Sequence, residues 1–90
     1  MKIFTAEQVK AKLWCPIKYV CVNGEYRFID NYDSHSDLVN SGEKAISAGV
    51  ISIRENYFVI TSHYSTTLNI VAKEEDEEEL SKILNLPFEK

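Results

Sequence analysis

The chain has 90 residues, of which 44% belong to the hydrophobic set and 27% are charged, and its formal net charge at pH 7 is -4. This length predicts one small domain, residues 1–90, and the low glycine and proline content argues against general disorder. A net negative charge argues against nucleic-acid binding, because phosphate contacts need clustered Lys and Arg side chains. It favours a protein partner with a basic or neutral surface.

The sequence contains neither a secretory signal pattern nor a membrane span, because its apolar runs are far shorter than the ~18 residues that cross a bilayer. We therefore expect a cytoplasmic protein with no membrane partner. Cys15 and Cys21 lie six positions apart. In one extended segment their α-carbons are roughly 20 Å apart, which is too far for a disulfide. Both are expected to be reduced, buried thiols.

A short N-terminal helix is predicted by Thr5-Ala6-Glu7-Gln8, which fits a capping box. In that motif the Thr5 hydroxyl accepts from the third helical amide while Gln8 reaches back. Val9 and Leu13 are four positions apart, so we expect them to form one apolar stripe against a sheet. Pro16 is expected to end this helix, since the residue before a proline is displaced from helical geometry.

A β-hairpin is the clearest local pattern. Residues Ile17–Val22 are rich in β-branched and aromatic types, and Asn23-Gly24 follows at once. That pair suits a two-residue turn with positive φ, so the returning strand is expected at Glu25–Ile29.

A long loop is predicted over residues 30–43, with one helical turn at Ser36–Val39, because turn-forming and capping side chains dominate there. Loops of this length in a small domain are often functional. The strand that follows, through Ile53, has apolar side chains on both faces from Ile46 onward, which is typical of a covered central strand. Gly49 within it indicates a bulge or a close approach of another backbone.

Two more strands are predicted, at Tyr57–Thr61 after a tight turn at Glu55-Asn56, and at Thr67–Val71 after a corner. Six acidic residues at 74–79 then begin a C-terminal helix, since carboxylates complement the free amides of a first helical turn. Its expected buried stripe is Leu80, Ile83 and Leu84, with Pro87 as the stop. The acidic run is either a solvated helix start or a surface for a basic partner.

These elements predict an α+β fold. We expect an antiparallel meander sheet of four to five strands, a short N-terminal helix, and a C-terminal helix packed on one face.

The two histidines, His35 and His63, allow three interpretations. Because imidazole titrates near neutral pH, they can act as base and acid in metal-free cleavage of an ester or phosphodiester. With Asp33 or Asp37 they can instead bind a divalent metal, although the spacing differs from helical metal motifs. The structural interpretation is that His35 and the hydroxyls beside it bond the loop backbone.

Other chemistry has little support in the sequence. Ser65–Thr67 lie outside a Gly-x-Ser-x-Gly elbow, and Gly24, Gly42 and Gly49 are too scattered to cradle a phosphate. No cofactor is expected. Trp14 and the tyrosines exceed what a small core needs, and such side chains often anchor protein interfaces.

A longer pattern is formed by Gly24-Glu25-Tyr26-Arg27-Phe28, His35-Ser36-Asp37-Leu38, Gly42, Ile46–Ile53 and Ser62-His63-Tyr64. It spans residues 24–64 and resembles a β-meander segment of bacterial polymorphic-toxin and related mobile-element proteins. There the final corner reads Ser-Gly-His-Tyr; here it lacks the glycine, and no proline follows. The resemblance implies a prokaryotic or phage accessory protein in which His35, Ala48, Gly49 and His63 shape a local fold. It implies no activity.

The leading interpretation is a small non-enzymatic protein-binding module of the inhibitor, immunity or accessory type, which binds through an aromatic and acidic surface. The candidate binding residues are Tyr26, Tyr32, Asp33, His35, Asp37, Tyr57, His63 and Tyr64. The alternative is a small metal-independent hydrolase or nuclease-like domain that uses His35 and His63. A homo-oligomer joined through an exposed sheet edge is the third interpretation.

Overall fold

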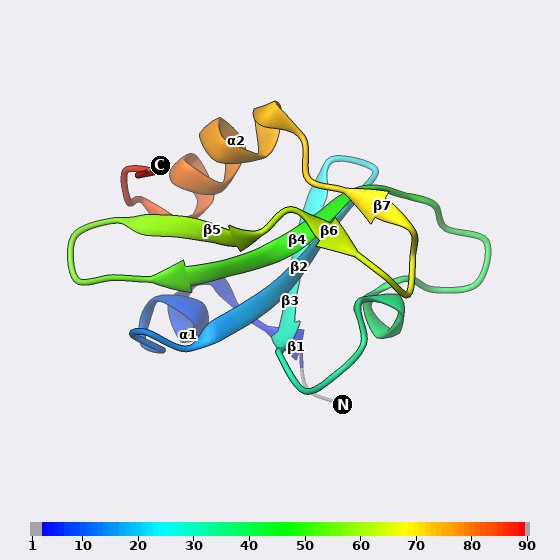
Figure 1. Cartoon of the computed structure of the whole chain (residues 1–90), viewed down its shortest axis with the longest axis horizontal. Coiled ribbons are helices and arrows are strands. Elements are labelled where there is room, and N and C mark those ends of the chain that lie inside the picture. Colours follow the sequence, from blue (N-terminus) through cyan, green and yellow to red (C-terminus); the bar gives the residue numbers. More distant parts are fainter. Residues whose placement is uncertain (1–2, 90) are drawn as a thin grey trace.

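The computed structural model describes residues 3–89 (Figure 1). In chain order the elements are β1 (Ile3–Phe4), α1 (Ala6–Lys10), β2 (Pro16–Val22), β3 (Glu25–Asp30), the 3₁₀ helix η1 (His35–Leu38), β4 (Ala45–Ile53), β5 (Phe58–Ser62), β6 (Tyr64–Ser65), β7 (Ile70–Val71) and α2 (Glu74–Leu84).

The fold class is α+β with an antiparallel five-stranded sheet, a short N-terminal helix and a C-terminal helix, which confirms the prediction. The strand order is β1-β3-β2-β4-β5. β2 is therefore the central strand, paired with β3 on one side and β4 on the other. β3 and β4 flank β2 on opposite sides, so the segment that joins them, which contains η1, crosses over β2.

The β2–β3 hairpin forms as its turn sequence predicts. Asn23 and Gly24 have φ values of 53° and 81°, so the turn uses the left-handed region that these two residue types tolerate. Val22 pairs with Glu25 directly across the turn.

The two helices cover one face of the sheet. The capping box of α1 is present, with the Thr5 hydroxyl accepting from the amide of Gln8 at 3.2 Å and the Gln8 side chain accepting from the amide of Thr5 at 2.9 Å. The core on this face contains Phe4, Val9, Ile17, Tyr19, Phe28, Ile51, Ile53, Phe58, Leu80 and Leu84. Figure 1 shows α2 at the upper left of the molecule.

The opposite face is covered by η1 and by the β6–β7 hairpin, which lies at the right of Figure 1. Its core consists of Val20, Val22, Ile29, Leu38, Ala45 and Ala48, with Leu68 and Ile70 packed against it. β4 is therefore covered on both faces, as its two apolar faces predicted. The helical turn expected at Ser36–Val39 is present, one residue earlier.

Gly49 marks a close approach of backbones, as predicted. A Cβ atom at this position would lie 2.7 Å from the carbonyl oxygen of Ser62 and 2.9 Å from the ring of Tyr19. Only a glycine leaves room here for β5 and for the Tyr19 ring.

The prediction of a strand at Thr67–Val71 in the main sheet is wrong, both in the length of the strand and in the sheet to which it belongs. Only Ile70 and Val71 are extended, and they pair with Tyr64 and Ser65 in a separate two-stranded sheet. Residues 66–69 form the turn, because the Ser65 hydroxyl accepts from the amide of Leu68 at 3.3 Å and Asn69 is left-handed. The fifth strand of the main sheet is instead β1.

The apolar stripe predicted for α1 is half wrong. Val9 is buried, but the helix ends at Lys10, and Leu13 is 46% exposed beside the end of β4. The amide of Trp14 donates to the carbonyl of Ile53 at 2.8 Å, which fastens the turn after the helix to the end of β4.

The C-terminal helix differs from its prediction at two points. Leu80 and Leu84 are fully buried, whereas Ile83 is 41% exposed. The helix ends at Leu84 because Asn85 takes a left-handed conformation, ahead of the predicted stop at Pro87.

The segment after α2 returns to the sheet at β5. The amide of Phe58 donates to the carbonyl of Pro87 at 3.0 Å, and the amide of Glu89 donates to the carbonyl of Phe58 at 2.9 Å. The rings of Phe58 and Phe88 pack with their centroids 5.4 Å apart. We call residues 87–89 the tail strap.

Cys15 and Cys21 are both free thiols. Cys21 is buried, as predicted, but Cys15 is exposed, because it lies in the turn before β2. Between residues 3 and 89, no helix is long and apolar enough to cross a membrane.

Candidate functional site

A buried carboxylate links α2 to the sheet. Asp76 is 2% exposed. Its Oδ1 accepts from the hydroxyls of Tyr26 at 2.7 Å and Ser47 at 2.8 Å, and its Oδ2 accepts from the Tyr19 hydroxyl at 2.7 Å and the Lys73 amide at 2.9 Å. A carboxylate offers about four acceptor positions, so Asp76 is saturated.

This arrangement holds a negative charge with neutral donors and the N-terminal end of a helix, where the backbone dipoles favour an anion. Burial and then the bond to Asp76 raise the pKa of Tyr19 and of Tyr26, so both phenols stay protonated as donors. Cys21 lies on the same face, and burial raises the pKa of its thiol. The cluster therefore positions α2, and neither the thiol nor the phenols are activated as nucleophiles.

A hollow of about 510 Å³ opens above this cluster, between α2 and the hairpin end of the sheet. We call it the α2 groove; its lining residues are Cys21, Gly24, Tyr26, Ile46, Ser47, Lys73, Glu75, Asp76, Glu79 and Ile83. On its floor the hydroxyls of Tyr26 and Ser47 both donate to Asp76. Its apolar walls are Ile46 and Ile83, which are 46% and 41% exposed.

Local backbone geometry brings Ile46 into the groove. Cys21 pairs with Ser47 and Val22 pairs with Ala45, so Ile46 is an extra residue in a β-bulge. Its two neighbours in β4 are buried, while Ile46 itself projects beside Ser47 toward α2. Ile46 is therefore an exposed isoleucine between two buried residues of β4.

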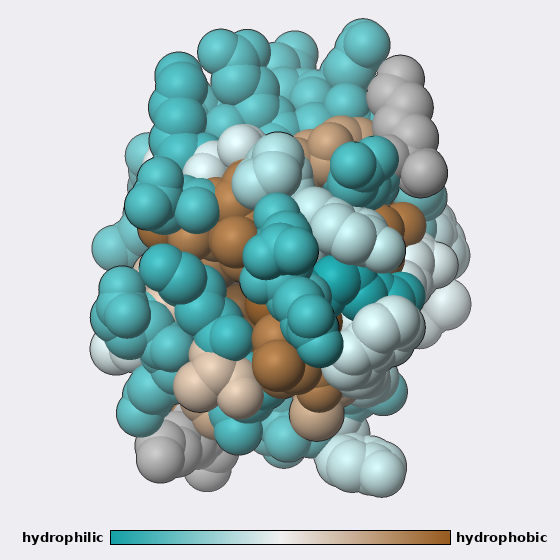
Figure 2. Space-filling view, turned by 90° about the vertical axis from the view of Figure 1, so that its left-hand side faces the viewer, coloured by the Kyte–Doolittle hydropathy of each residue, from teal (hydrophilic) through white to brown (hydrophobic). Residues whose placement is uncertain are grey.

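The rim of the groove is acidic. Glu75 and Glu79 line it from α2, together with Lys73, and the remaining carboxylates of the helix continue around its outer surface. Figure 2 views the molecule from the side of the β4–β5 turn; hydrophilic side chains cover its top, at the level of α2 in Figure 1, and hydrophobic side chains form a strip below. Lys82 offsets part of this charge through pairs with Glu78 at 3.6 Å and Glu79 at 3.8 Å.

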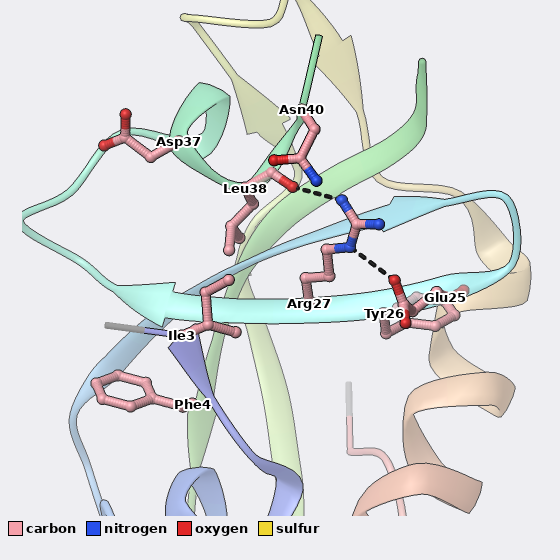
Figure 3. Close-up of a pocket in the computed structure, with 8 residues that line it drawn as sticks. All are labelled: Ile3, Phe4, Glu25, Tyr26, Arg27, Asp37, Leu38 and Asn40. Carbon is pink, nitrogen blue, oxygen red and sulfur yellow. Dashed lines mark hydrogen bonds and ion pairs between the residues drawn. The ribbon is translucent and has the colours of Figure 1, made fainter. Parts of the chain in front are cut away.

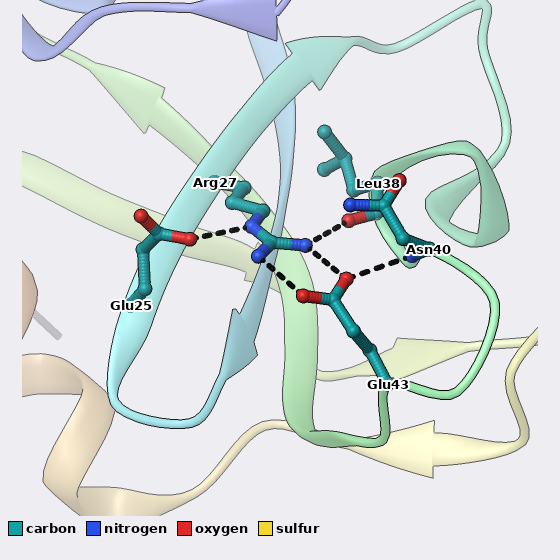
Figure 4. A network of polar contacts seen from close by, with 5 residues as sticks. All are labelled: Glu25, Arg27, Leu38, Asn40 and Glu43. Atoms are coloured by element: carbon teal, nitrogen blue, oxygen red, sulfur yellow. Dashed lines mark hydrogen bonds and ion pairs between the residues drawn. The ribbon is translucent and has the colours of Figure 1, made fainter.

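A second hollow, of about 380 Å³, lies beside β1 and β3 (Figure 3). Its prominent polar group is Arg27, whose side chain reaches from β3 toward the carbonyl of Leu38, at 2.8 Å. Figure 4 shows the guanidinium surrounded: Nε donates to Glu25 at 2.7 Å, and two N–H groups donate to Glu43 at 2.6 and 2.8 Å.

Glu43 completes this network by accepting from the amide of Asn40 at 2.8 Å. The Arg27 bonds and then the Asn40 amide hold the pKa of Glu43 down to about 2, and the same carboxylates raise the pKa of Arg27. Because four of its five N–H groups are engaged and two of them face the Glu43 carboxylate, Arg27 joins residues 38–43 to β3 and is poorly placed to bind a substrate anion.

The two histidines lie in different surroundings. His35 is 4% exposed, and its Nε2 donates to the carbonyl of Gly49 at 2.8 Å; burial lowers its pKa. His63 is exposed and lines a hollow of about 330 Å³ beside Glu77 of α2. η1 packs through Leu38 against the second core cluster, whereas the hollow at His63 is lined by Glu77 of α2, so the two histidines have different neighbours.

The other predicted binding residues are distributed along the loops. Tyr32 is 96% exposed, and Tyr64 is 44% exposed with its hydroxyl donating to Asn69 at 2.6 Å. The Asp33 carbonyl accepts from the Lys18 ammonium at 2.6 Å, and the Asp37 carboxylate accepts from the Ser34 amide at 3.3 Å.

Tyr57 is partly buried in the β4–β5 turn, where its carbonyl accepts from the amide of Arg54 at 2.8 Å. That turn lies at the far left of Figure 1, whereas the loop with Tyr32 and His35 lies at the lower right. Of the predicted set, the structure places only Tyr26 in the α2 groove, and the eight residues do not form one site.

Sequence reasoning missed Asp76, Ser47 and the exposure of Ile46 and Ile83. One signal was available for Asp76: it stands three positions after Lys73, at the capping-box position of the helix. The three hydroxyl partners of Asp76 lie 29 to 57 positions away, so no local pattern identified them. Within residues 3–89 no group of three or more His, Cys, Asp or Glu side chains is placed to hold a metal ion.

Comparison with known protein families, with curated proteins and with solved structures finds no match to this chain. The site is therefore interpreted from its own geometry.

Proposed function

We propose that this chain is a non-enzymatic protein-binding module of the inhibitor, immunity or accessory type, and that the α2 groove is its principal contact surface. One observation carries the proposal. Ile46 and Ile83, both half exposed, face the same hollow beneath the acidic rim formed by Glu75 and Glu79. An apolar centre with a charged rim is the anatomy of a protein interface.

The energies fit a docking surface. Complete burial of an isoleucine contributes about 1.5–3 kcal/mol, so covering the exposed halves of Ile46 and Ile83 contributes roughly 2 kcal/mol in total. The remaining affinity has to come from the partner's contacts with the rim and floor. The carboxylates of the rim favour a partner with Lys or Arg side chains and speed its approach.

The exposed tyrosines support the aromatic part of this proposal. Tyr32, in the loop after β3, and Tyr64, in β6, are both exposed, and tyrosine is enriched in interfaces because it combines apolar area with a polar tip. The free thiols of Cys15 and Cys21 fit a reducing compartment, and we place the module in the cytoplasm of a prokaryotic or phage-infected cell.

The hydrolase alternative lacks a comparable arrangement. A general acid and a general base must both reach the substrate within hydrogen-bond distance. His35 is buried with its Nε2 bonded to the Gly49 carbonyl, so its ring is not open to a substrate, and His63 lines a hollow that does not include His35.

The proposal is tested by affinity capture from the native host, followed by quantitative mass spectrometry, with three baits. These are the wild type, Ile83→Gln in the groove, and Ile3→Gln as a matched control, because Ile3 is 51% exposed but lies outside the groove. We expect at least one protein that the wild type and I3Q retain and I83Q loses. A wild-type bait that retains nothing above background, or a captured set that I83Q leaves unchanged, contradicts the proposal.

A further inference from the structure

The α2 groove sets requirements for its occupant. The space between Ile46 and Ile83 suits a large apolar side chain, and the rim carboxylates of Glu75 and Glu79 suit a cation next to it. An aromatic residue with a neighbouring Arg or Lys meets both requirements.

The chain itself presents such a pair. Trp14 is 64% exposed, and the guanidinium carbon of Arg54 lies 3.9 Å from the centre of its ring. Leu13, next to Trp14, is 46% exposed. We call Leu13, Trp14 and Arg54 the Trp14 knob.

The backbone holds the knob outward at a cost. Trp14 has a φ of 66°, the left-handed region that bulky side chains avoid, so this conformation is strained. The bond from its amide to the carbonyl of Ile53 fixes the residue there. Strained backbone that exposes a large aromatic residue is a feature of binding sites.

The knob and the groove lie at opposite ends of β4. Ile46 is the second residue of that strand, while Trp14 bonds to its last residue, Ile53. Seven positions along a strand span about 23 Å at 3.3 Å per residue. A chain therefore cannot insert its own Trp14 into its own groove.

We propose that the α2 groove of one copy of this chain receives the Trp14 knob of a second copy, so that copies associate head to tail. In this arrangement Trp14 lies between Ile46 and Ile83, and Arg54 faces Glu75 and Glu79. Each copy uses two different surfaces, so the interface is heterologous and growth continues until a ring closes. The inference rests on the proposed function, because it takes the groove as a protein-binding surface.

The test is the mass of the purified chain in solution, measured by sedimentation velocity over a range of concentrations. Trp14→Asn removes the knob with a residue that tolerates the left-handed region, and Ile83→Gln alters the groove with a good helix former. Tyr32→Ser is the control, because Tyr32 is the most exposed aromatic residue and lies outside both surfaces. Circular dichroism confirms that each variant is folded.

We expect the average mass of the wild type and of Y32S to rise with concentration. In W14N and I83Q the dissociation constant should increase at least about tenfold, as for loss of an interface hot spot. The decisive sample is an equimolar mixture of W14N and I83Q. One intact groove and one intact knob remain in it, so we expect a species of two chains and no larger one.

A wild type that stays monomeric throughout, a mass that W14N and I83Q leave unchanged, or a mixture that does not form the two-chain species overturns head-to-tail association. These failures are distinct from failure of the proposed function. If the chain is monomeric and I83Q still loses a host protein that W14N retains, the groove binds a different partner and the proposed function stands.

Discussion

Two polar networks fasten segments of this chain to its sheet, and water reaches them to different extents. Asp76 is 2% exposed and accepts from uncharged donors, whereas Arg27 and Glu43 form a two-bond ion pair with side chains 17% and 24% exposed. When a buried network loses one member, the others cannot turn to water. At the surface, solvent replaces the lost partner. We infer that the fold depends more on Asp76 than on the ion pair.

The largest effect is expected for Asp76→Ala. This change leaves the hydroxyls of Tyr19 and Ser47 and the amide of Lys73 without their acceptor, and each unsatisfied group costs about 1–3 kcal/mol. We expect the free energy of unfolding to fall by about 3–4 kcal/mol in urea titrations. Glu75→Ala is the matched control, one position away and exposed, and its effect should be below about 0.5 kcal/mol. Equal losses of free energy of unfolding in D76A and E75A would show that the fold does not depend on the buried Asp76 network.

The next effect separates the two phenols that Asp76 accepts from. Tyr19 is fully buried, while Tyr26 is partly exposed on the groove floor. Tyr19→Phe should therefore lower the free energy of unfolding by about 2 kcal/mol, and Tyr26→Phe by about 1 kcal/mol, because water can reach the second site. Thermal or urea unfolding of both variants measures this. If Y26F lost more free energy of unfolding than Y19F, burial would not explain the relative strengths of the two hydrogen bonds.

A smaller effect is expected from pH at His35. Burial lowers its pKa in the folded state, so the unfolded chain takes up a proton more readily. Stability from the neutral ring is complete above the ordinary histidine pKa, near 6.5, and is lost as pH falls below it. His35→Gln, which keeps a donor for the Gly49 carbonyl, should flatten this part of the stability profile. If H35Q leaves the dependence of stability on pH unchanged, the loss of stability at low pH comes from a group other than His35.

The smallest effect is expected at the surface pair. Glu43→Gln should change stability little at neutral pH, and added salt should shrink the difference further. The folded pKa of Glu43 is lowered to about 2, so its contribution is present above the unfolded pKa and fades as pH falls from about 4.5 to 2. Carboxyl NMR titration should find Glu43 as the glutamate with the lowest pKa. A normal midpoint would show that the ion pair does not persist in solution.

The parts of the fold that the sequence predicted have local causes. The Asn23-Gly24 turn, the Thr5–Gln8 capping box and Gly49 each depend on the conformational or steric properties of one or two residues. Such signals do not depend on knowing which elements pack together.

The parts that were missed depend on distant contacts. Asp76 stands among five exposed or partly exposed glutamates and was interpreted with them, because nothing nearby reveals the phenols that it meets. Ile83 fits the helical stripe of Leu80 and Leu84, yet it faces a groove created by a bulge in β4. Tertiary packing thus decided which acidic residue is buried and which isoleucines are exposed.

The tail strap has a practical consequence for handling this protein. Pro87 and Glu89 bind the outward amide and carbonyl of Phe58, in the outermost strand. Proteolytic loss of residues 87–89 would leave that strand able to recruit identical molecules into growing, insoluble ladders. Preparations should therefore be checked by mass for an intact tail strap before any aggregation is attributed to the sequence itself.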